Sequence, residues 1–281
     1  METVIRVNVN YGGFVDVSTK DWPGRSVCTV FLRGCPLRCS YCHNAAIQAG
    51  TDERDIGEVI KKIDDSLLLV SGVIFSGGEP TLQADALATL ARAAKQRGLL
   101  VGLQTNGYFP DVLSTLIEEQ LVDRIALDYK TQWEGYSTLK EGYGGATKEA
   151  YSRQISRSIR ICEKAWHEGH LPEFEIVLTL FWENEEIILE IAKKLPRVPI
   201  VLQQGRRKRF WKEWELSRQE NGTPHLSESD IRGERPPLSY DDLAKIGGKI
   251  SKLGRTIKIR TTGTGEVVYE SDRDRWVACQ R

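Results

Sequence analysis

The sequence predicts an α/β protein built as a barrel, or an incomplete barrel, of parallel strands. Short apolar runs alternate with amphipathic segments along most of the 281 residues. Several of these runs are apolar throughout, as expected of strands that are buried on both faces. Strands that alternate with helices form parallel sheets joined by right-handed crossovers. About six or seven such units fit a barrel or part of one, and a doubly wound open sheet is the alternative.

Seven apolar runs are predicted to be strands. They cover residues 27–33, 72–76, 99–104, 124–128, 174–180, 200–203 and 256–260. The first thirteen residues, METVIRVNVNYGG, alternate like a further strand ahead of them and lack the apolar core of a signal peptide. We therefore expect an N-terminal β extension on the barrel.

Four segments are predicted to be helices. They cover residues 84–97, 147–167, a stretch from Asn184 to just before Pro196, and 239–253. The second shows the clearest helical spacing of apolar side chains, at Tyr151, Ile155, Ile159, Cys162 and Trp166. Glycine follows three of these segments, which is a common way for a helix to end.

Residues 205–237 break this rhythm, because they form a long, polar stretch that contains three prolines. Structureless loops of this length are rare in compact domains unless they are functional or mobile. We therefore expect a single domain over residues 1–281. Its core would cover about 25–204, followed by an insertion at about 205–237 and a C-terminal extension at 238–281 that adds a helix and a strand.

The composition excludes some classes of protein. The 39 basic residues balance the 39 acidic residues, so the net charge gives no argument for nucleic acid or membrane binding. No apolar run approaches the roughly 18 residues of a membrane-spanning helix. Six cysteines are too few for a disulfide scaffold, whereas three of them within eight residues indicate a metal site in a reducing compartment. We expect a cytoplasmic protein.

Cys35, Cys39 and Cys42 directly follow the strand predicted at residues 27–33. Three thiolates on one short loop can hold one iron–sulfur cluster and leave one iron open to an added ligand. The alternative is a zinc ion held by the three cysteines and His43. Cys42 and His43 are adjacent, however, and neighbouring residues converge poorly on one tetrahedral ion.

The other cysteines have no such spacing. Cys28 lies in a predicted strand and Cys162 on the apolar stripe of a predicted helix, where a free cysteine acts as a small apolar residue. Cys279 is close to the end of the sequence. Cys28 as a fourth cluster ligand remains an alternative.

Polar motifs follow the predicted strands at their C-terminal ends, where (β/α) barrels place their chemistry. These motifs are Gly77-Gly78-Glu79-Pro80, Gln104-Thr105-Asn106-Gly107, Asp128-Tyr129-Lys130 and Gln203. Paired glycines allow the backbone to approach a ligand closely. A tight turn, an Asn-Gly turn and a surface ion pair are the alternatives for the first three motifs.

The run CPLRCSYCHN, residues 35–44, resembles the CxxxCxxC signature of radical S-adenosylmethionine (radical SAM) enzymes. The resemblance implies a partial (β/α)6-type barrel and a [4Fe–4S] cluster on Cys35, Cys39 and Cys42. It also implies an oxidoreductase in which the amine and carboxylate of S-adenosylmethionine chelate the open iron. An electron from the cluster would break the sulfonium and release a 5′-deoxyadenosyl radical, which abstracts hydrogen from a substrate. No catalytic residue beyond the three cysteines is expected.

The same resemblance implies which residues bind the cofactor. The glycine motif would contact its ammonium group, the aromatic residue between the second and third cysteines would pack on its adenine, and the other strand-end motifs would complete the site. The residues concerned are Tyr41, His43, Gly77, Gly78, Glu79, Pro80, Thr105, Asn106, Asp128, Lys130 and Gln203.

The stretch before the cysteines is more specific. Residues 13–16 (GFVD) and 21–24 (DWPG), followed by FLRGC and YCHN, look like the activating proteins of anaerobic ribonucleotide reductase and are similar to pyruvate formate-lyase activators. This resemblance covers about residues 12–204. It implies a glycyl radical enzyme as partner and a reduced flavodoxin- or ferredoxin-like electron donor. The compact activators are shorter than this chain, and residues 205–237 have no counterpart in them.

Two loops are candidates for substrate binding. Residues 205–214 interleave basic and aromatic residues, which could bind RNA or could form a short helix packed on its aromatic side. Residues 133–145 follow a predicted strand and could form a wall of the active site. The candidate substrate residues are Trp133, Tyr136, Arg206, Arg207 and Trp211. The alternative function is therefore a radical SAM enzyme that modifies RNA, a peptide or a small metabolite.

Overall fold

The computed structural model of the chain describes residues 7–37, 39, 41–130, 148–206, 237–269 and 277–278. Within these residues the strands form one sheet in the order β11-β10-β9-β8-β7-β6-β5-β4-β2-β1-β3. Seven neighbouring strands of this sheet are parallel. They are β2 (Val27–Leu32), β4 (Gly72–Gly77), β5 (Leu100–Thr105), β6 (Arg124–Asp128), β7 (Glu173–Leu180), β8 (Ile200–Gln204) and β9 (Ile257–Thr261). Each lies within one residue of its predicted bounds.

Helices connect the successive parallel strands. They are α1 (Ile56–Ser66), α2 (Ala84–Gln96), α3 (Pro110–Glu118), α4 (Lys148–His167), α5 (Glu185–Lys194) and α8 (Tyr240–Ser251). The sequence analysis did not predict α1 or α3. No helix in the described part of the chain is both long and apolar enough to span a bilayer.

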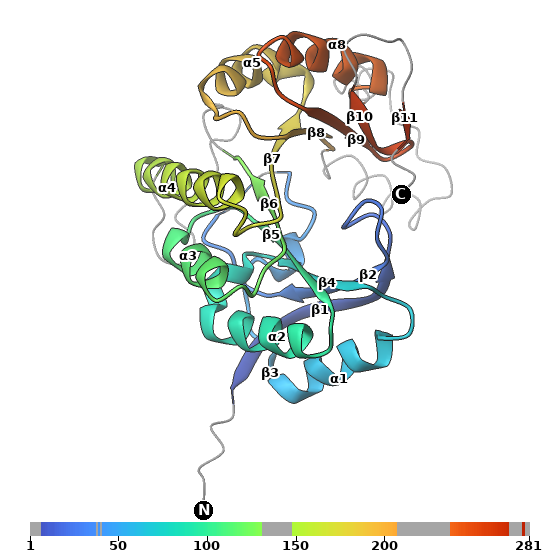
Figure 1. The fold of residues 1–281 in the computed structure, drawn as a ribbon, viewed down its shortest axis with the longest axis vertical. Coiled ribbons are helices and arrows are strands. Elements are labelled where there is room, and N and C mark those ends of the chain that lie inside the picture. The colour runs from blue at the N-terminus through green and yellow to red at the C-terminus, as the bar shows by residue number, and fades with distance from the viewer. Residues whose placement is uncertain are drawn as a thin grey trace, which may run out of the picture.

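The parallel strands stand in chain order, which decides between the two expected architectures. A doubly wound sheet reverses its strand order at a switch point, and the described parallel strands show no reversal. Figure 1 shows the helices along the outside of a curved sheet whose outermost strands do not meet. The prediction of an incomplete (β/α) barrel is therefore confirmed, and the doubly wound alternative is wrong.

Antiparallel strands extend both edges of the barrel sheet. β1 (Asn8–Ser18) pairs with β2 and with the short β3 (Glu53–Asp55), which confirms the predicted N-terminal extension. At the other edge, β10 (Gly265–Tyr269) pairs with β9 and β11 (Val277–Ala278). The short strands β3, β10 and β11 were not predicted.

The loop between β1 and β2 fills part of the barrel interior. Its Trp22 is 2% exposed and packs with Val27 and Ile74. Gly102 in β5 makes room for this indole, because a Cβ atom at that position would lie 3.0 Å from the Trp22 ring. The DWPG motif that supports the family resemblance therefore has a packing role.

Candidate functional site

A cavity of about 390 Å³ opens at the C-terminal ends of the parallel strands. The structure brings most of the predicted site residues together in its wall. Those that line it are Cys35, Cys39, Tyr41, Cys42, His43, Gly77, Gly78, Glu79, Thr105, Asn106, Asp128, Lys130 and Gln203. Pro80, buried behind Glu79, and Arg206 are described but do not line it. Trp133, Tyr136, Arg207 and Trp211 lie outside the described residues, as do most of the predicted insertion and Cys279.

The cysteine loop and the glycine turn meet backbone to backbone. A Cβ atom at Gly78 would lie 2.1 Å from the carbonyl oxygen of Gly34, and one at Gly77 would lie 2.3 Å from that of Leu32. Gly77 also has a φ of 129°, which side chains other than glycine rarely adopt. The paired glycines are thus required by the close approach of the two loops.

The three cysteines line the cavity together, with Cys35 buried and Cys39 and Cys42 half-buried. Burial, together with the negative charges of Glu79, Cys39 and Cys42, raises the pKa of Cys35 to about 12. Burial also raises the pKa of Cys39, whereas the ammonium of Lys130 lowers it. Thiolates in such a place need compensating positive charge, which metal ions supply. The donor set therefore fits an iron–sulfur cluster.

The alternative assignments of the cysteines find no support in the geometry. Within the described residues, no three Cys, His, Asp or Glu side chains converge as ligands of a single metal ion. A cluster does not require this convergence, because each thiolate binds a different iron. Cys28 faces the carbonyl oxygen of Gly72, with its Sγ 3.9 Å away, and Cys162 is buried in α4. Both are packed as small apolar residues, as predicted.

Two polar side chains hold the start and end of the cysteine loop, and neither was predicted. Arg33 donates from Nε to the carbonyl of Tyr11 at 3.1 Å and from Nη1 to the carbonyl of Ala46 at 3.1 Å. Gln83 donates from Nε2 to the carbonyls of Asn10 and Arg33, both at 2.9 Å. These contacts fix the loop to β1 and to the turn that starts at Pro80.

Glu79 is fully buried and bonded entirely within the protein. Its carboxylate accepts hydrogen bonds from the Thr81 amide at 3.0 Å, the Thr81 hydroxyl, the Thr105 hydroxyl at 2.7 Å and the Asn106 amide at 2.7 Å. Burial raises the pKa of Glu79, and these bonds partly offset the rise. A carboxylate accepts about four hydrogen bonds. Contact with a cofactor ammonium would therefore require Glu79 to give up a bond that joins the turns after β4 and β5.

Asp128 is the last residue of β6 and Lys130 follows it, on the side of the cavity next to Cys39. Their charged groups are 3.4 Å apart. The ammonium of Lys130 is 5.5 Å from the centre of the Tyr41 ring, and that ring packs edge-on against Phe181. This corner thus offers a carboxylate, an ammonium and an aromatic face to a bound molecule.

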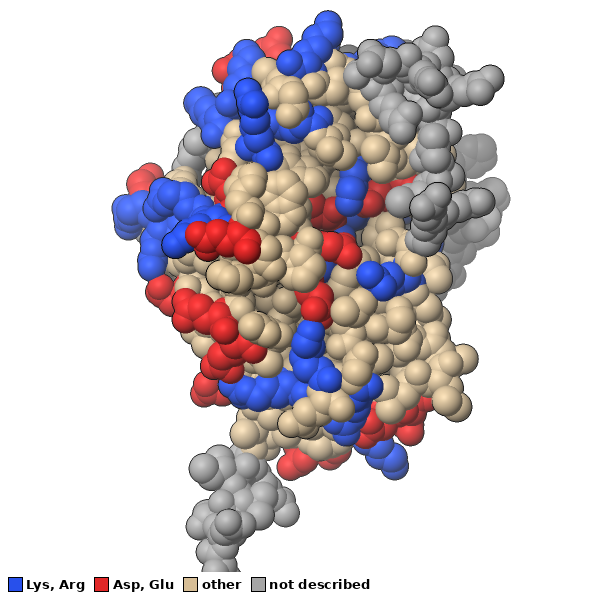
Figure 2. All heavy atoms as spheres, in the orientation of Figure 1, with Lys and Arg blue, Asp and Glu red and all other residues tan. Residues whose placement is uncertain are grey.

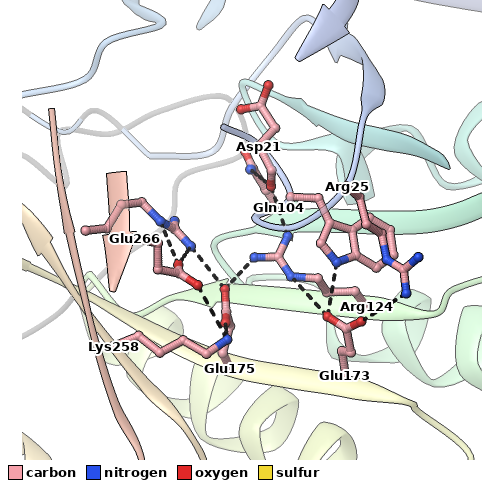
Figure 3. A network of polar contacts seen from close by, with 10 residues as sticks. Asp21, Arg25, Gln104, Arg124, Glu173, Glu175, Lys258 and Glu266 are labelled. Carbon is pink, nitrogen blue, oxygen red and sulfur yellow. Dashed lines mark hydrogen bonds and ion pairs between the residues drawn. The ribbon is translucent and has the colours of Figure 1, made fainter. Parts of the chain in front are cut away.

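A charged network lies on β6, β7, β9 and β10 and consists of Arg124, Glu173, Glu175, Lys258, Arg260 and Glu266. Of these residues, Arg260 lines the cavity. Figure 3 shows Arg124 between Glu173 and Glu175, with Lys258 in β9 and Glu266 in β10 nearby. Glu175 pairs with Arg124, with Lys258 at 2.8 Å and with Arg260 at 3.3 Å. Burial alone would raise the pKa of Glu175, but the three cations outweigh it and lower the value to about 2.

This network was not predicted from the sequence. The signal in the sequence was Glu175 inside the apolar run of β7, together with the alternating basic residues Lys258 and Arg260 in β9. Such charges in otherwise apolar strands indicate a buried ion pair. They do not indicate which strands supply the partners.

Comparison with known proteins agrees with this geometry. Residues 29–195, more than half of the chain, match the family model "Radical SAM superfamily". A pyruvate formate-lyase-activating enzyme from Clostridium pasteurianum is 32% identical over 189 residues, which are 63% of this chain and 72% of that enzyme.

Two further relatives match over shorter stretches. A Methanocaldococcus jannaschii protein named as a candidate glycyl-radical enzyme activating enzyme is 36% identical over 154 residues, which are 54% of this chain. The match spans 62% of that relative, less than two thirds of its length. A 7-carboxy-7-deazaguanine synthase from Methanospirillum hungatei is 39% identical over 84 residues, which are 29% of this chain and 35% of that enzyme. The chain therefore belongs to the radical SAM superfamily and is an enzyme whose cofactors are a [4Fe–4S] cluster and S-adenosylmethionine.

Proposed function

We propose that this enzyme activates a glycyl radical enzyme by abstracting hydrogen from a backbone glycine of that partner. The observation that carries the proposal is the match to a pyruvate formate-lyase-activating enzyme over 72% of its length. The relative named as a candidate glycyl-radical enzyme activating enzyme supports the same class of reaction. A reduced flavodoxin- or ferredoxin-like protein would supply the electron.

Cys35, Cys39 and Cys42 would hold the cluster in this proposal. Bound together, the cluster and S-adenosylmethionine supply a 5′-deoxyadenosyl radical that takes a hydrogen atom from the substrate. The protein's part is to exclude water and to fix positions. The loop of Trp22 fills the barrel behind the cavity, and the backbone packing of Gly78 on Gly34 sets the distance between the glycine turn and the cysteines.

The remaining cavity residues would bind the cofactor. Lys130 can pair with a carboxylate, Asp128 can accept a hydrogen bond from an ammonium or hydroxyl group, and Tyr41 offers an aromatic face. His43, Gly77, Gly78, Thr105 and Gln203 line the same space. Glu79 would act mainly by holding the two turns together, because its carboxylate is already bonded within the protein.

An electron-spin experiment tests the activating role. The anaerobically reconstituted enzyme, reduced in the presence of S-adenosylmethionine, is mixed with candidate glycyl radical enzymes. We expect a glycyl radical signal in one partner, and no signal with the Cys39→Ser variant. If the enzyme cleaves S-adenosylmethionine but no partner acquires a radical, the activating role is wrong, although the cluster assignment stands.

A small metabolite is the second candidate substrate, because of the similarity to a 7-carboxy-7-deazaguanine synthase. In that case a low-molecular-mass extract would stimulate formation of 5′-deoxyadenosine, and no protein would acquire a radical. RNA gains less support. Acidic and basic side chains are interspersed over the face in Figure 2, without an extended basic patch among its described residues.

A further inference from the structure

We infer that Asn106 raises the reduction potential of the cluster by donating a hydrogen bond to the thiolate of Cys35. The inference rests on the proposed assignment of Cys35 as a cluster ligand and is independent of the substrate. The family resemblance implied that Asn106 contacts the cofactor. Asn106 lines the cavity, and the structure places its amide nitrogen, Nδ2, 3.7 Å from Cys35 Sγ.

The contact is buried on both sides. Asn106 is 4% exposed and Cys35 is 6% exposed. The backbone amide of Leu37 also donates to the same sulfur, at 3.4 Å. Cys35 thus receives two hydrogen bonds from neutral donors, whereas Cys39 has the ammonium of Lys130 as its positive neighbour.

The orientation of the Asn106 amide is fixed by its other contacts. Its Oδ1 accepts a hydrogen bond from the backbone amide of Tyr108 at 2.9 Å. If the amide were flipped, two donors would face each other at this position, so Nδ2 must be the atom that faces the sulfur. The Asn106 backbone donates to Glu79 and accepts from the Tyr151 hydroxyl at 3.0 Å. The residue is therefore held in place before any cofactor binds.

The physical effect follows from charge. Reduction adds an electron to the cluster and makes its sulfur ligands more negative. The positive end of the Asn106 amide dipole stabilises this added charge, and the low dielectric of a buried site strengthens the interaction. Hydrogen bonds to the sulfurs are among the factors that set the potentials of such clusters. Asn106 acts on the cluster through Cys35 and makes it easier to reduce.

The test is a potentiometric titration of the reconstituted enzyme, followed by electron-spin resonance without substrate. Asn106→Leu removes the donor at similar size, and Asn106→Ala removes it with less strain. Ser76→Ala is the matched control, because Ser76 also lines the cavity but donates to Gln104 at 2.9 Å and not to a sulfur. We expect both Asn106 variants to carry a full cluster with a lower midpoint potential, and the control to match the wild type.

An unchanged midpoint in an Asn106 variant that carries a full cluster would overturn the inference. Should neither variant hold its cluster, the wild-type enzyme provides the test. Selective ¹⁵N labelling of asparagine amides must then give a ¹⁵N coupling in pulsed spin resonance of the reduced cluster, and absence of that coupling overturns the inference. A wild-type enzyme that binds no cluster would refute both this inference and the assignment of the three cysteines. A missing glycyl radical would refute only the proposed activating role, so the two failures can be told apart.

Discussion

Glu79 and Glu175 are two buried carboxylates, one in the cavity wall and one in the charged network, and the protein stabilises them in different ways. Glu79 is bonded by two hydroxyl groups and two backbone amides, none of which carries a charge. Glu175 is surrounded by Arg124, Lys258 and Arg260. Burial raises the pKa of Glu79, whereas the cations lower that of Glu175 despite its burial.

The difference reflects what each carboxylate joins. Neutral donors on Glu79 join the turns after β4 and β5, whereas the positive charge beside the cysteines comes from Lys130 near Cys39. In the charged network, the ion pairs join β7 to β9, and Glu266 in β10 completes them. Glu175 lies within the stretch that matches the family, whereas β9 and β10 lie beyond it. The charged network thus attaches the C-terminal strands to the barrel.

Replacing Glu175 by glutamine should have the largest effect on stability. It leaves Arg124 and its neighbouring cations buried with one carboxylate fewer, and breaking a buried ion pair costs about 3–5 kcal/mol. The measurement is the free energy of unfolding in urea. Glu190→Gln is the control, because Glu190 pairs with Lys193 on the surface, and little or no loss is expected there. Equal behaviour of the two variants would show that the network does not stabilise the fold.

Acid should remove the advantage of the wild type over Glu175→Gln. The pKa of Glu175 falls from 4.5 to about 2 on folding, so the unfolded chain takes up this proton first as the pH drops. The stabilisation is therefore fully present above about pH 5 and is lost progressively toward pH 2. Urea unfolding of both proteins across this range measures the gap between them. A gap that stays constant with pH would show that Glu175 is not the group that titrates.

The contrast between Glu79 and Glu175 also shows which features could be predicted from the sequence. Continuous apolar runs such as residues 72–76 gave the parallel strands to within one residue, because burial on both faces leaves little choice of side chain. The cysteine spacing and the polar strand ends gave the place of the site. The partners of Glu79 and Glu175 could not be predicted, since they come from loops and strands that only the folded chain brings together. Helix α1 could have been found from its capping Asp55 and its apolar Val59 and Ile63.

Replacing Glu79 by glutamine should have a smaller effect on stability but a specific effect on the cluster. The amide nitrogen would face a donor, such as the Asn106 backbone amide, and leave it unsatisfied at a cost of about 1–3 kcal/mol. Loosening of the two turns should also lower the iron content per chain. Glu175→Gln is the comparison, because it should lose stability while keeping its iron. Loss of iron in both variants to the same degree would mean that the turns joined by Glu79 and the charged network around Glu175 do not act independently on the cluster.

Replacing Trp22 by phenylalanine should have the smallest effect on stability. It tests whether the Trp22 indole takes part in the charged network through Glu173. The phenyl ring keeps most of the packing against Val27 and Ile74 but loses the hydrogen bond from Trp22 Nε1 to Glu173, which is 3.1 Å long. Because Glu173 is partly exposed, water can replace this donor, and the loss should be about 0.5–1.5 kcal/mol. A double-mutant cycle with Glu173→Ala, which removes the acceptor, isolates the bond from the packing. Additive losses would mean that the indole acts by packing alone and that Trp22 is not part of the charged network.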